Sequence, residues 1–325
     1  MRAVEIPAVG EPPRVTERDD PAVPGDEDVL VEVEFVALNP LDLAVASGAF
    51  RGGHPPLPFI PGSEAVGRVL APEARRGERV WVLGDGLGVA RDGTLAAQVA
   101  VSASSAVPIG DAVASVKAAA LGMAGLTGHL ATCWRSPVRE DDCVVVLGAT
   151  GTVGRVAVQT ARILGARRVV GVGRDRTRLD ELLARSHVDA VVQLDDATDD
   201  DALKEAAGGN GPTLVVDLLW GEPAVSAVAA AAPGARLVQV GAAAGDIAAL
   251  PSAHVRGKAL DVLGFSVFSV PHQERTEGFR RLLEHAAHDG LDVAADVHPV
   301  TTIADAWAEL ARGGSKVVID LRSTG

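Results

Sequence analysis

The stretch Val144-Val145-Val146-Leu147-Gly148-Ala149-Thr150-Gly151-Thr152-Val153-Gly154 decides the fold of this chain. Its first four residues are apolar, as expected for a strand that is buried on both faces. Gly151 would let the backbone approach a pyrophosphate, and Gly154 would let the following helix pack closely on the strand. The first helical turn supplies N–H donors to phosphate oxygens. The stretch therefore predicts a dinucleotide-binding turn, whose cofactor-binding residues are Ala149, Gly151, Thr152, Val153 and Gly154.

Further apolar runs follow this strand, and helical stretches separate most of them. This alternation is typical of βαβ units and predicts an α/β fold with a doubly wound parallel sheet of the Rossmann type in residues 116–270. The runs are Arg168–Val172, Ala190–Val192, Leu214–Val216, Leu237–Val240 and Leu260–Leu263. Ala149 stands where the usual fingerprint has its first glycine, so an α/β fold whose glycine turn binds nothing stays open as the alternative.

Residues 1–115 show a different pattern of apolar and polar residues. Val29–Val36 alternates between apolar and polar residues as a half-buried strand does, and Pro- and Gly-rich segments separate it from shorter strand patterns. This pattern predicts a compact, β-rich unit that is antiparallel or barrel-like. Residues 271–325 contain helices and the strand pattern Lys316–Ile319. Because they follow a completed sheet, we expect them to rejoin the N-terminal unit.

The end of the second strand of the predicted sheet indicates which dinucleotide is bound. NAD sites place a carboxylate there for the ribose 2′-hydroxyl, whereas this strand ends in Gly171-Val172-Gly173. Arg174 and Arg178 follow, and a guanidinium pairs well with a 2′-phosphate. The sequence therefore predicts NADP(H). Asp175 leaves NAD(H) open, because a shift of one residue would aim its carboxylate at the ribose.

Composition excludes several classes of function. The chain has 325 residues, a net charge of −13, two cysteines and no tyrosine. Two cysteines cannot build a disulfide framework or a four-cysteine zinc site. The acidic balance argues against a nucleic-acid partner. No apolar run reaches the roughly 20 residues of a membrane span, and the N-terminus lacks the apolar core of a signal peptide. We therefore expect a cytoplasmic protein with no membrane partner.

Several segments together resemble the medium-chain dehydrogenase/reductase superfamily, in its zinc-lacking, quinone oxidoreductase-like branch. The resemblance extends over almost the whole chain and keeps the order of the motifs. The matching segments are Asn39–Asp42, Ile60–Gly67, Gly77–Val80, Ala118–Leu121, Gly125–Thr127 and Gly314–Val318. The resemblance implies a GroES-like catalytic domain formed by both chain ends around the Rossmann domain, a cleft between the two domains, and a homodimer.

The zinc-dependent relatives differ from this chain at their metal ligands. They carry a cysteine in the segment that matches Asn39–Asp42 and a histidine at the position of Ser63, before the matching Glu64. The segment that holds their structural zinc is absent here as well. The resemblance therefore implies that no metal is bound. The chain also departs from its zinc-lacking relatives, which place tyrosines in the cleft where Ala44 and Phe50 stand here.

The resemblance implies three catalytic residues. Asn39 matches a cleft asparagine whose amide holds the cofactor or a substrate oxygen, with a loop amide bonded to its own turn as the alternative. Thr127 matches a threonine whose hydroxyl faces the nicotinamide, with a helix-packing hydroxyl as the alternative. Asp42 matches a common aspartate of the family, and a helix-capping role is equally open.

Further residues are candidates for contacts with the ligands. Gly241, Phe265 and Ser266 follow the fifth and sixth strands of the predicted sheet, at the carboxyl ends where such folds bind ligands, and the resemblance implies contact with the nicotinamide. Phe50 is a candidate wall of the substrate site. His54 lies in a loop expected to border that site and has a pKa range suited to a proton donor.

These observations predict an NADPH-dependent, zinc-independent reductase that transfers hydride to a quinone or an α,β-unsaturated carbonyl compound. The small number of polar groups in the expected site favours a bulky, apolar acceptor. Two alternatives stay open. One is a biosynthetic enoyl reductase, and the other is a non-catalytic NADPH-binding sensor or structural protein.

Overall fold

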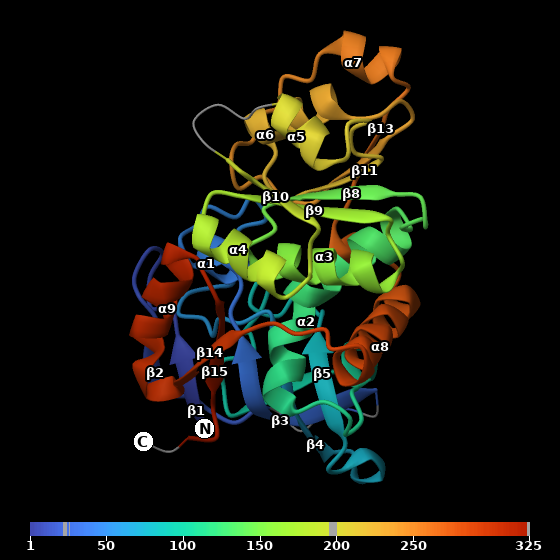
Figure 1. The fold of residues 1–325 in the computed structure, drawn as a ribbon. Helices are drawn as coiled ribbons and strands as arrows, with labels where there is room; N and C mark the ends of the chain where they lie inside the picture. The colour runs from blue at the N-terminus through green and yellow to red at the C-terminus, as the bar shows by residue number, and fades with distance from the viewer. Residues whose placement is uncertain (22–24, 26, 195–199, 324–325) are drawn as a thin grey trace. The chain divides into compact units, whose positions relative to one another are not determined.

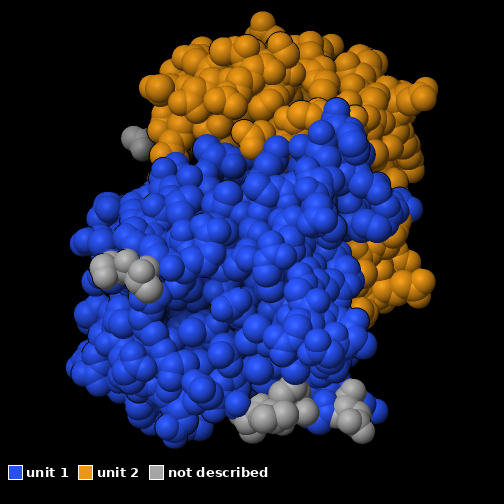
Figure 2. All heavy atoms as spheres, turned by 90° about the horizontal axis from the view of Figure 1, so that it is seen from below, with its two compact units in different colours: residues 1–124, 279–288, 293–325 blue, residues 125–278, 289–292 orange. Residues whose placement is uncertain are grey.

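The computed structural model describes residues 1–21, 25, 27–194 and 200–323. The chain divides into two compact units, which Figure 2 shows in different colours. Unit 1 contains Met1–Ala124, Phe279–His288 and Val293–Gly325, and unit 2 contains Gly125–Gly278 and Asp289–Asp292. The two chain ends therefore belong to the same unit. The domain boundaries after residues 115 and 270 stay a prediction, because compact units are not the same as independently folding domains.

Unit 2 is built on a parallel sheet of six strands in the order β10-β9-β8-β11-β12-β13. The central strand β8 begins at Cys143 and ends at Leu147, and all of its residues are buried, as the apolar run predicts. The order reverses beside β8, with β9 on one side and β11 on the other. The strands are β8 (Cys143–Leu147), β9 (Arg168–Gly173), β10 (Ala190–Gln193), β11 (Leu214–Asp217), β12 (Arg236–Gln239) and β13 (Asp261–Gly264).

Helices cover both faces of this sheet. Figure 1 shows α3 and α4 on one face and α5 and α6 on the other, which makes the sheet doubly wound. Helix α3 begins at Thr152, directly after the glycine turn, and most of its residues are buried. The helices are α3 (Thr152–Ile163), α4 (Arg176–Ala184), α5 (Asp200–Ala206), α6 (Gly221–Ala230) and α7 (Ser252–Gly257).

Unit 1 contains a sheet of seven strands in the order β14-β15-β3-β4-β5-β7, with β6 also paired to β3. All pairs are antiparallel except β14 with β15. The C-terminal strand β15 pairs with β3, so the end of the chain completes the N-terminal sheet. The strands are β3 (Asp28–Ala37), β4 (Glu64–Ala71), β5 (Arg79–Leu83), β6 (Gln98–Ser102), β7 (Ala106–Pro108), β14 (Ala295–Pro299) and β15 (Lys316–Asp320).

The remaining elements of unit 1 surround this sheet. A separate antiparallel hairpin contains β1 (Arg2–Glu5) and β2 (Arg14–Glu17). Helices α1 (Pro40–Ala46) and α9 (Ile303–Arg312) lie in unit 1, whereas α8 (His272–His288) starts in unit 2 and ends in unit 1. Helix α2 (Ser115–Leu130) starts in unit 1, ends in unit 2 and runs directly into a π-helix at Ala131–Arg135. In the described part of the chain, no helix is long and apolar enough to cross a membrane.

Candidate cofactor-binding and active site

The glycine turn of unit 2 has the close packing that its sequence predicts. Gly148 follows β8 with a φ of +85°, a conformation that favours glycine. A Cβ atom on Gly154 would lie 2.2 Å from the carbonyl oxygen of Gly148, so only glycine allows the first turn of α3 to lie against the loop. A Cβ atom on Gly128, at the end of α2, would lie 2.4 Å from the Val153 carbonyl oxygen. Glycines on two elements thus hold this turn in place.

The same turn leaves room for a ligand in front of α3. Gly151 is exposed, and a Cβ atom there would have only the Gly148 carbonyl oxygen as a neighbour, at 3.7 Å. Thr152 and Val153 are partly exposed, whereas Ala149 is buried and its Cβ atom packs near Gly171 of β9. The N–H groups of the first helical turn have no partners within the helix. The turn therefore fits a dinucleotide pyrophosphate.

The end of β9 is followed by a run of charged side chains. Gly173, the last residue of the strand, is buried beside the side chain of Thr150. The Asp175 carboxylate accepts a hydrogen bond from the Arg178 backbone N–H at 3.1 Å and so caps helix α4. The side chain of Arg178 pairs with Asp175 at 3.4 Å. Arg174 is exposed, and its side chain has no acid partner within the described residues.

The loops at the carboxyl edge of the sheet are organised by Asp217, the last residue of β11. Its Oδ1 atom accepts hydrogen bonds from the backbone N–H groups of Leu219 and Trp220, both at 2.9 Å. Burial raises the pKa of this carboxyl, although these two bonds favour its ionised form. Gly241 lies on the next loop, where a Cβ atom would meet the Leu218 carbonyl oxygen at 2.8 Å. The loop at Gly241 therefore depends on a close backbone approach.

The segment after β13 contains the other predicted contacts of the carboxyl edge. The Phe265 N–H donates to the Gln239 carbonyl oxygen at 2.9 Å, and the Phe265 side chain is buried. Ser266 is exposed on the same segment. Thr127 lies near the end of α2 and is half-buried, whereas its neighbours from Gly125 to Leu130 are all buried. Thr127 is thus the least buried residue in this part of the helix.

A buried carboxylate, Glu64, connects several elements of unit 1. Its Oε2 atom accepts hydrogen bonds from Trp81 Nε1 at 2.9 Å and from the Met123 backbone N–H at 2.6 Å. Helix α2 breaks at Gly122, whose φ of −23° and ψ of −131° are not helical. A Cβ atom on Gly122 would lie 1.9 Å from Glu64 Oε2. The absence of a side chain at Gly122 therefore allows the carboxylate to reach the backbone at the break.

Lys316, the first residue of β15, is the buried cation of the same group. Its Nζ atom lies 3.6 Å from Glu64 Oε1 and donates to Asn39 Oδ1 at 2.6 Å and to the Leu38 carbonyl oxygen at 3.0 Å. The Asn39 amide donates to Glu64 Oε1 at 2.9 Å and to the Ala37 carbonyl oxygen at 3.1 Å. The Asn39 side chain, 2% exposed, is thus bonded within unit 1 through its oxygen and its nitrogen.

Asp42 completes this group from the first turn of α1. Its Oδ2 atom accepts a hydrogen bond from the Asn39 backbone N–H at 2.7 Å, which is a capping contact. Burial raises the pKa of the Asp42 carboxyl to about 6, against the opposing effects of that hydrogen bond and of the Lys316 charge. Burial also lowers the pKa of the Lys316 ammonium, although Glu64 and Asp42 both oppose this. We call Asn39, Asp42, Glu64 and Lys316 the buried charge cluster.

Sequence reasoning missed Lys316 and the break at Gly122. A signal existed, because both Glu64 and Lys316 stand at the first position of an apolar strand pattern. Charged side chains are rarely buried without a partner, so a charged residue at a strand position expected to be buried is a candidate for an ion pair. The pairing itself could not be predicted, since the two residues lie far apart in the chain. Only the sheet order β15-β3-β4 brings Lys316 on β15 near Glu64 on β4.

The two candidate substrate contacts lie together in unit 1. Phe50 is half-buried and packs against a small apolar cluster that contains Ile6, Val45 and Phe59. His54 is exposed, its Nδ1 atom lies 2.7 Å from the Pro55 carbonyl oxygen, and its ring stacks on Phe59 with 6.2 Å between the ring centres. The structure therefore connects both residues to Phe59.

The described residues contain no group of three or more histidine, cysteine, aspartate or glutamate side chains that could hold a metal ion. Ser63 is buried next to Glu64, at the position where the resemblance expects the zinc histidine. Cys133 and Cys143 are both free thiols, and Cys143 is buried in β8. Zinc independence stays a prediction that rests on the residues at these positions.

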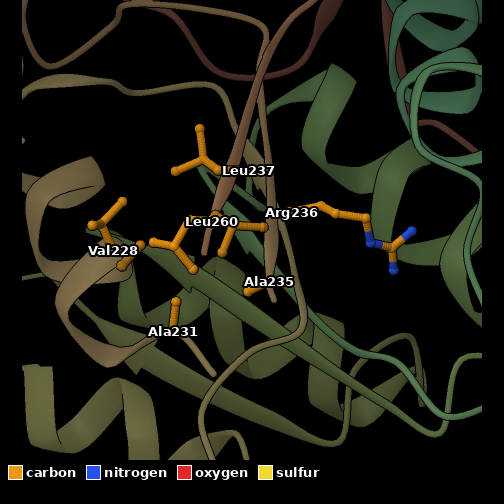
Figure 3. Close-up of a pocket in the computed structure, with 8 residues that line it drawn as sticks. Val228, Ala231, Ala235, Arg236, Leu237 and Leu260 are labelled. Atoms are coloured by element: carbon orange, nitrogen blue, oxygen red, sulfur yellow. The ribbon is translucent and has the colours of Figure 1, made fainter. Parts of the chain in front are cut away.

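A small cavity lies elsewhere in unit 2, and alkyl groups line most of it. Figure 3 shows the guanidinium of Arg236 pointing away from this cavity. That guanidinium instead binds both oxygens of the buried Asp142 carboxylate. The cavity is lined by Val215, Ala227, Val228, Ala231, Ala235, Arg236, Leu237 and Leu260. It offers a nucleotide no convergent polar groups, so it is no candidate for the cofactor site.

Comparison with known proteins places the chain in a family. The family described as alcohol dehydrogenase GroES-like domain matches residues 25–111, and the family described as zinc-binding dehydrogenase matches residues 152–285. The chain is 24% identical over 326 residues to the quinone oxidoreductase of Rattus norvegicus, with 98% of this chain and 96% of the relative covered. It thus resembles that enzyme over nearly the full length of both.

Another relative is much longer. The chain is 31% identical over 316 residues to a phenolphthiocerol/phthiocerol polyketide synthase of Mycobacterium tuberculosis, and the match covers 93% of this chain. The chain spans only 14% of the length of that relative. Among solved structures, an NAD-dependent alcohol dehydrogenase superposes with a TM-score of 0.86 at 26% identity, covering 99% of this chain and 100% of the other. The chain belongs to the quinone oxidoreductase-like branch of the medium-chain dehydrogenase/reductase superfamily.

Proposed function

We propose that this protein is an oxidoreductase, namely an NADPH-dependent, zinc-independent reductase that transfers hydride to a quinone or an α,β-unsaturated carbonyl compound. The observation that carries the proposal concerns the end of β9. There, Gly173 occupies the position of a ribose-binding carboxylate, and the exposed Arg174 has no acid partner among the described residues. The capping contact of Asp175 with α4 further supports NADPH, because it already engages that carboxylate. A bound nicotinamide nucleotide would supply the hydride.

The residues of unit 2 would bind and orient the cofactor. The backbone N–H groups at Thr152, Val153 and Gly154 would receive the pyrophosphate at the start of α3. Arg174, assisted by Arg178, would pair with the 2′-phosphate. The Thr127 hydroxyl is the proposed catalytic group of this unit, because Thr127 is half-buried in a part of α2 whose other residues are buried. The remaining proposed cofactor contacts are Ala149, Gly151, Gly241, Phe265 and Ser266.

The residues of unit 1 would act on the substrate. We propose that Phe50 and His54 bind an apolar acceptor, because Phe50 offers a ring and His54 is exposed beside Phe59. Asn39 and Asp42 belong to the buried charge cluster. The bond from Lys316 to Asn39 and the bond between Asn39 and Asp42 would hold the loop before α1 in one conformation. Such positioning is the contribution that a protein makes when the cofactor carries the chemistry.

A turnover assay tests this function. The purified protein is incubated with NADPH and, separately, with NADH, together with a panel of quinones and enones, and the nicotinamide absorbance is followed. We expect oxidation of NADPH with at least one acceptor and a lower kcat/KM with NADH. The Thr127→Ala variant should reduce turnover by about tenfold or more while NADPH still binds. Binding of NADPH without turnover by any acceptor would favour the non-catalytic alternative.

A biosynthetic enoyl reductase is the second candidate. The similarity to a polyketide synthase supports it, since that match extends over 93% of this chain. An enoyl thioester in the same assay separates the two candidates. A kcat/KM for the thioester well above that for every quinone and enone would favour the enoyl reductase.

We also propose that the protein acts in the cytoplasm as a homodimer. Strand β13 lies at the edge of the six-stranded sheet, where Val262 is 40% exposed. An edge strand with an exposed apolar side chain is a surface that a second chain can cover. The molar mass in solution, measured by light scattering after size exclusion, tests this proposal, and a monomer at micromolar concentration would contradict it.

A further inference from the structure

The π-helix at Ala131–Arg135 makes contacts that the proposed function has not used. Arg135 donates a hydrogen bond from Nε to the carbonyl oxygen of Gly264 at 2.9 Å. The neighbouring Trp134 ring lies 6.3 Å from the Phe265 ring, at an interplanar angle of 54°. Both contacts are within unit 2. Two consecutive residues of the π-helix thus hold two consecutive residues at the end of β13.

The segment that follows the π-helix is itself firmly anchored. The guanidinium of Arg236 donates to the Ser136 hydroxyl at 3.0 Å and to the Pro137 carbonyl oxygen at 2.9 Å. The same guanidinium is paired with the buried Asp142 carboxylate. On the N-terminal side of Trp134 and Arg135, the Thr132 hydroxyl donates a hydrogen bond to the His129 carbonyl oxygen at 2.8 Å. Trp134 and Arg135 therefore project from a short segment that is fixed on both sides.

Within unit 2, the segment that they hold combines one buried residue, Phe265, whose N–H is bonded to Gln239, with exposed residues on either side. Strand β13 pairs only with β12, because it lies at the edge of the sheet. Gly264 and Ser266 are exposed, and Phe268 is 50% exposed. An edge segment of this kind is free to shift unless side chains fix it. Arg135 supplies a bond to it from outside the sheet.

We propose that Trp134 and Arg135 are positioning residues, which hold the Gly264–Ser266 segment in the conformation that binds the nicotinamide nucleotide. This inference rests on the proposed function, because it takes that segment as part of the cofactor site. Neither residue needs to touch the cofactor. Loss of the Arg135 bond would leave the Gly264 carbonyl without its donor and let the segment sample conformations that bind less well. The cost therefore falls on cofactor affinity rather than on hydride transfer.

The experiment compares three variants with the wild type. Arg135→Met removes the donor and keeps an unbranched side chain, Arg135→Lys restores a donor, and Trp134→Leu removes the ring. Arg167→Met is the matched control, because exposed Arg167 also donates from Nε to a backbone carbonyl oxygen, that of Asp141 at 3.3 Å, but at the amino ends of the strands. The measurements are the Kd for NADPH by fluorescence, the KM for NADPH, kcat, and the melting temperature.

We expect Arg135→Met to raise the Kd and the KM for NADPH by about five- to tenfold, with kcat changed less than about twofold. Arg135→Lys should recover most of the affinity, Trp134→Leu should weaken binding by a smaller factor, and Arg167→Met should bind NADPH as the wild type does. If the Arg135→Met protein is folded and binds NADPH as tightly as the wild type does, the positioning role is wrong, while the proposed function still stands. A wild-type protein that binds neither NADPH nor NADH would overturn the proposed function together with the positioning role.

Discussion

Lys316 Nζ lies 2.6 Å from Asn39 Oδ1, although 277 positions separate the two residues in the chain. The contact joins the first residue of the C-terminal strand β15 to the loop before α1. Lys316 is 4% exposed and Glu64 is fully buried, so the ammonium also balances a carboxylate that water does not reach. The geometry of the N-terminal loop is therefore set by the far end of the chain.

Removal of the buried cation should destabilise unit 1. In Lys316→Met the Glu64 carboxylate stays buried without its counter-charge, and Asn39 Oδ1 loses its donor. We expect the free energy of unfolding to fall by about 3–5 kcal/mol, the usual range for breaking a buried ion pair. Chemical denaturation followed by circular dichroism measures it. Lys204→Met, at an exposed position of α5, is the control and should change the value by less than about 0.5 kcal/mol. A small effect of Lys316→Met would show that the charges are not coupled.

The stability of the protein should depend on the protonation of Asp42. Its pKa is about 6 in the folded protein against the usual 3.8, so the folded state holds the proton more tightly. The contribution of Asp42 to the free energy of unfolding therefore falls as the pH rises from about 4 to about 6. Asp42→Asn keeps an acceptor for the Asn39 N–H and removes this fall. We expect the variant to gain, relative to the wild type, at most about 3 kcal/mol between pH ~4 and pH ~7.

Denaturation at several pH values measures this difference. The matched control is Asp305→Asn, because Asp305 also lies in the first turn of a helix, α9, but is exposed. This control reports what replacing an exposed first-turn aspartate by asparagine does over the same pH range. A constant difference for Asp42→Asn would mean that Asp42 titrates as it does in the unfolded chain.

The break in α2 requires a glycine at position 122. In Gly122→Ala the added methyl group would meet Glu64 Oε2 at 1.9 Å, so either the carboxylate or the helix must move. We expect a loss of about 3 kcal/mol or more in the free energy of unfolding, because the displaced carboxylate would lose its hydrogen bonds from the Trp81 N–H and the Met123 N–H. Gly257→Ala, in α7 with open space around the position, is the control. Equal stabilities of the two variants would rule out this role for Gly122.

Discrimination between NADPH and NADH should depend on Arg174. Arg174→Ala removes the guanidinium proposed for the 2′-phosphate, so we expect the KM for NADPH to rise by roughly tenfold while the KM for NADH stays unchanged. Steady-state kinetics with both cofactors measure the effect. Arg185→Ala, an exposed arginine at the end of α4, controls for a general change in surface charge. A rise in both KM values by the same factor would show that Arg174 does not recognise the 2′-phosphate.

Local patterns in the chain were sufficient to predict the α/β sheet and the glycine turn. Val144–Leu147 is a strand because its apolar residues are buried on both faces, and the turn requires Gly154 because helix and loop touch there. The return of the C-terminal segment was also predictable, and β15 does pair with β3. These features depend on neighbours in the sequence or on the order of the elements, which periodicity reveals.

Other features were decided by the tertiary structure alone. The Lys316–Asn39–Glu64 contacts, the break at Gly122 and the bond from Arg135 to Gly264 all join residues that lie far apart in the chain. Each depends on distances of a few ångströms between side chains, and no local pattern encodes such distances. A single sequence can therefore predict that Glu64 and Lys316 begin apolar strands, but the order of strands in the sheet decides that they share one buried site.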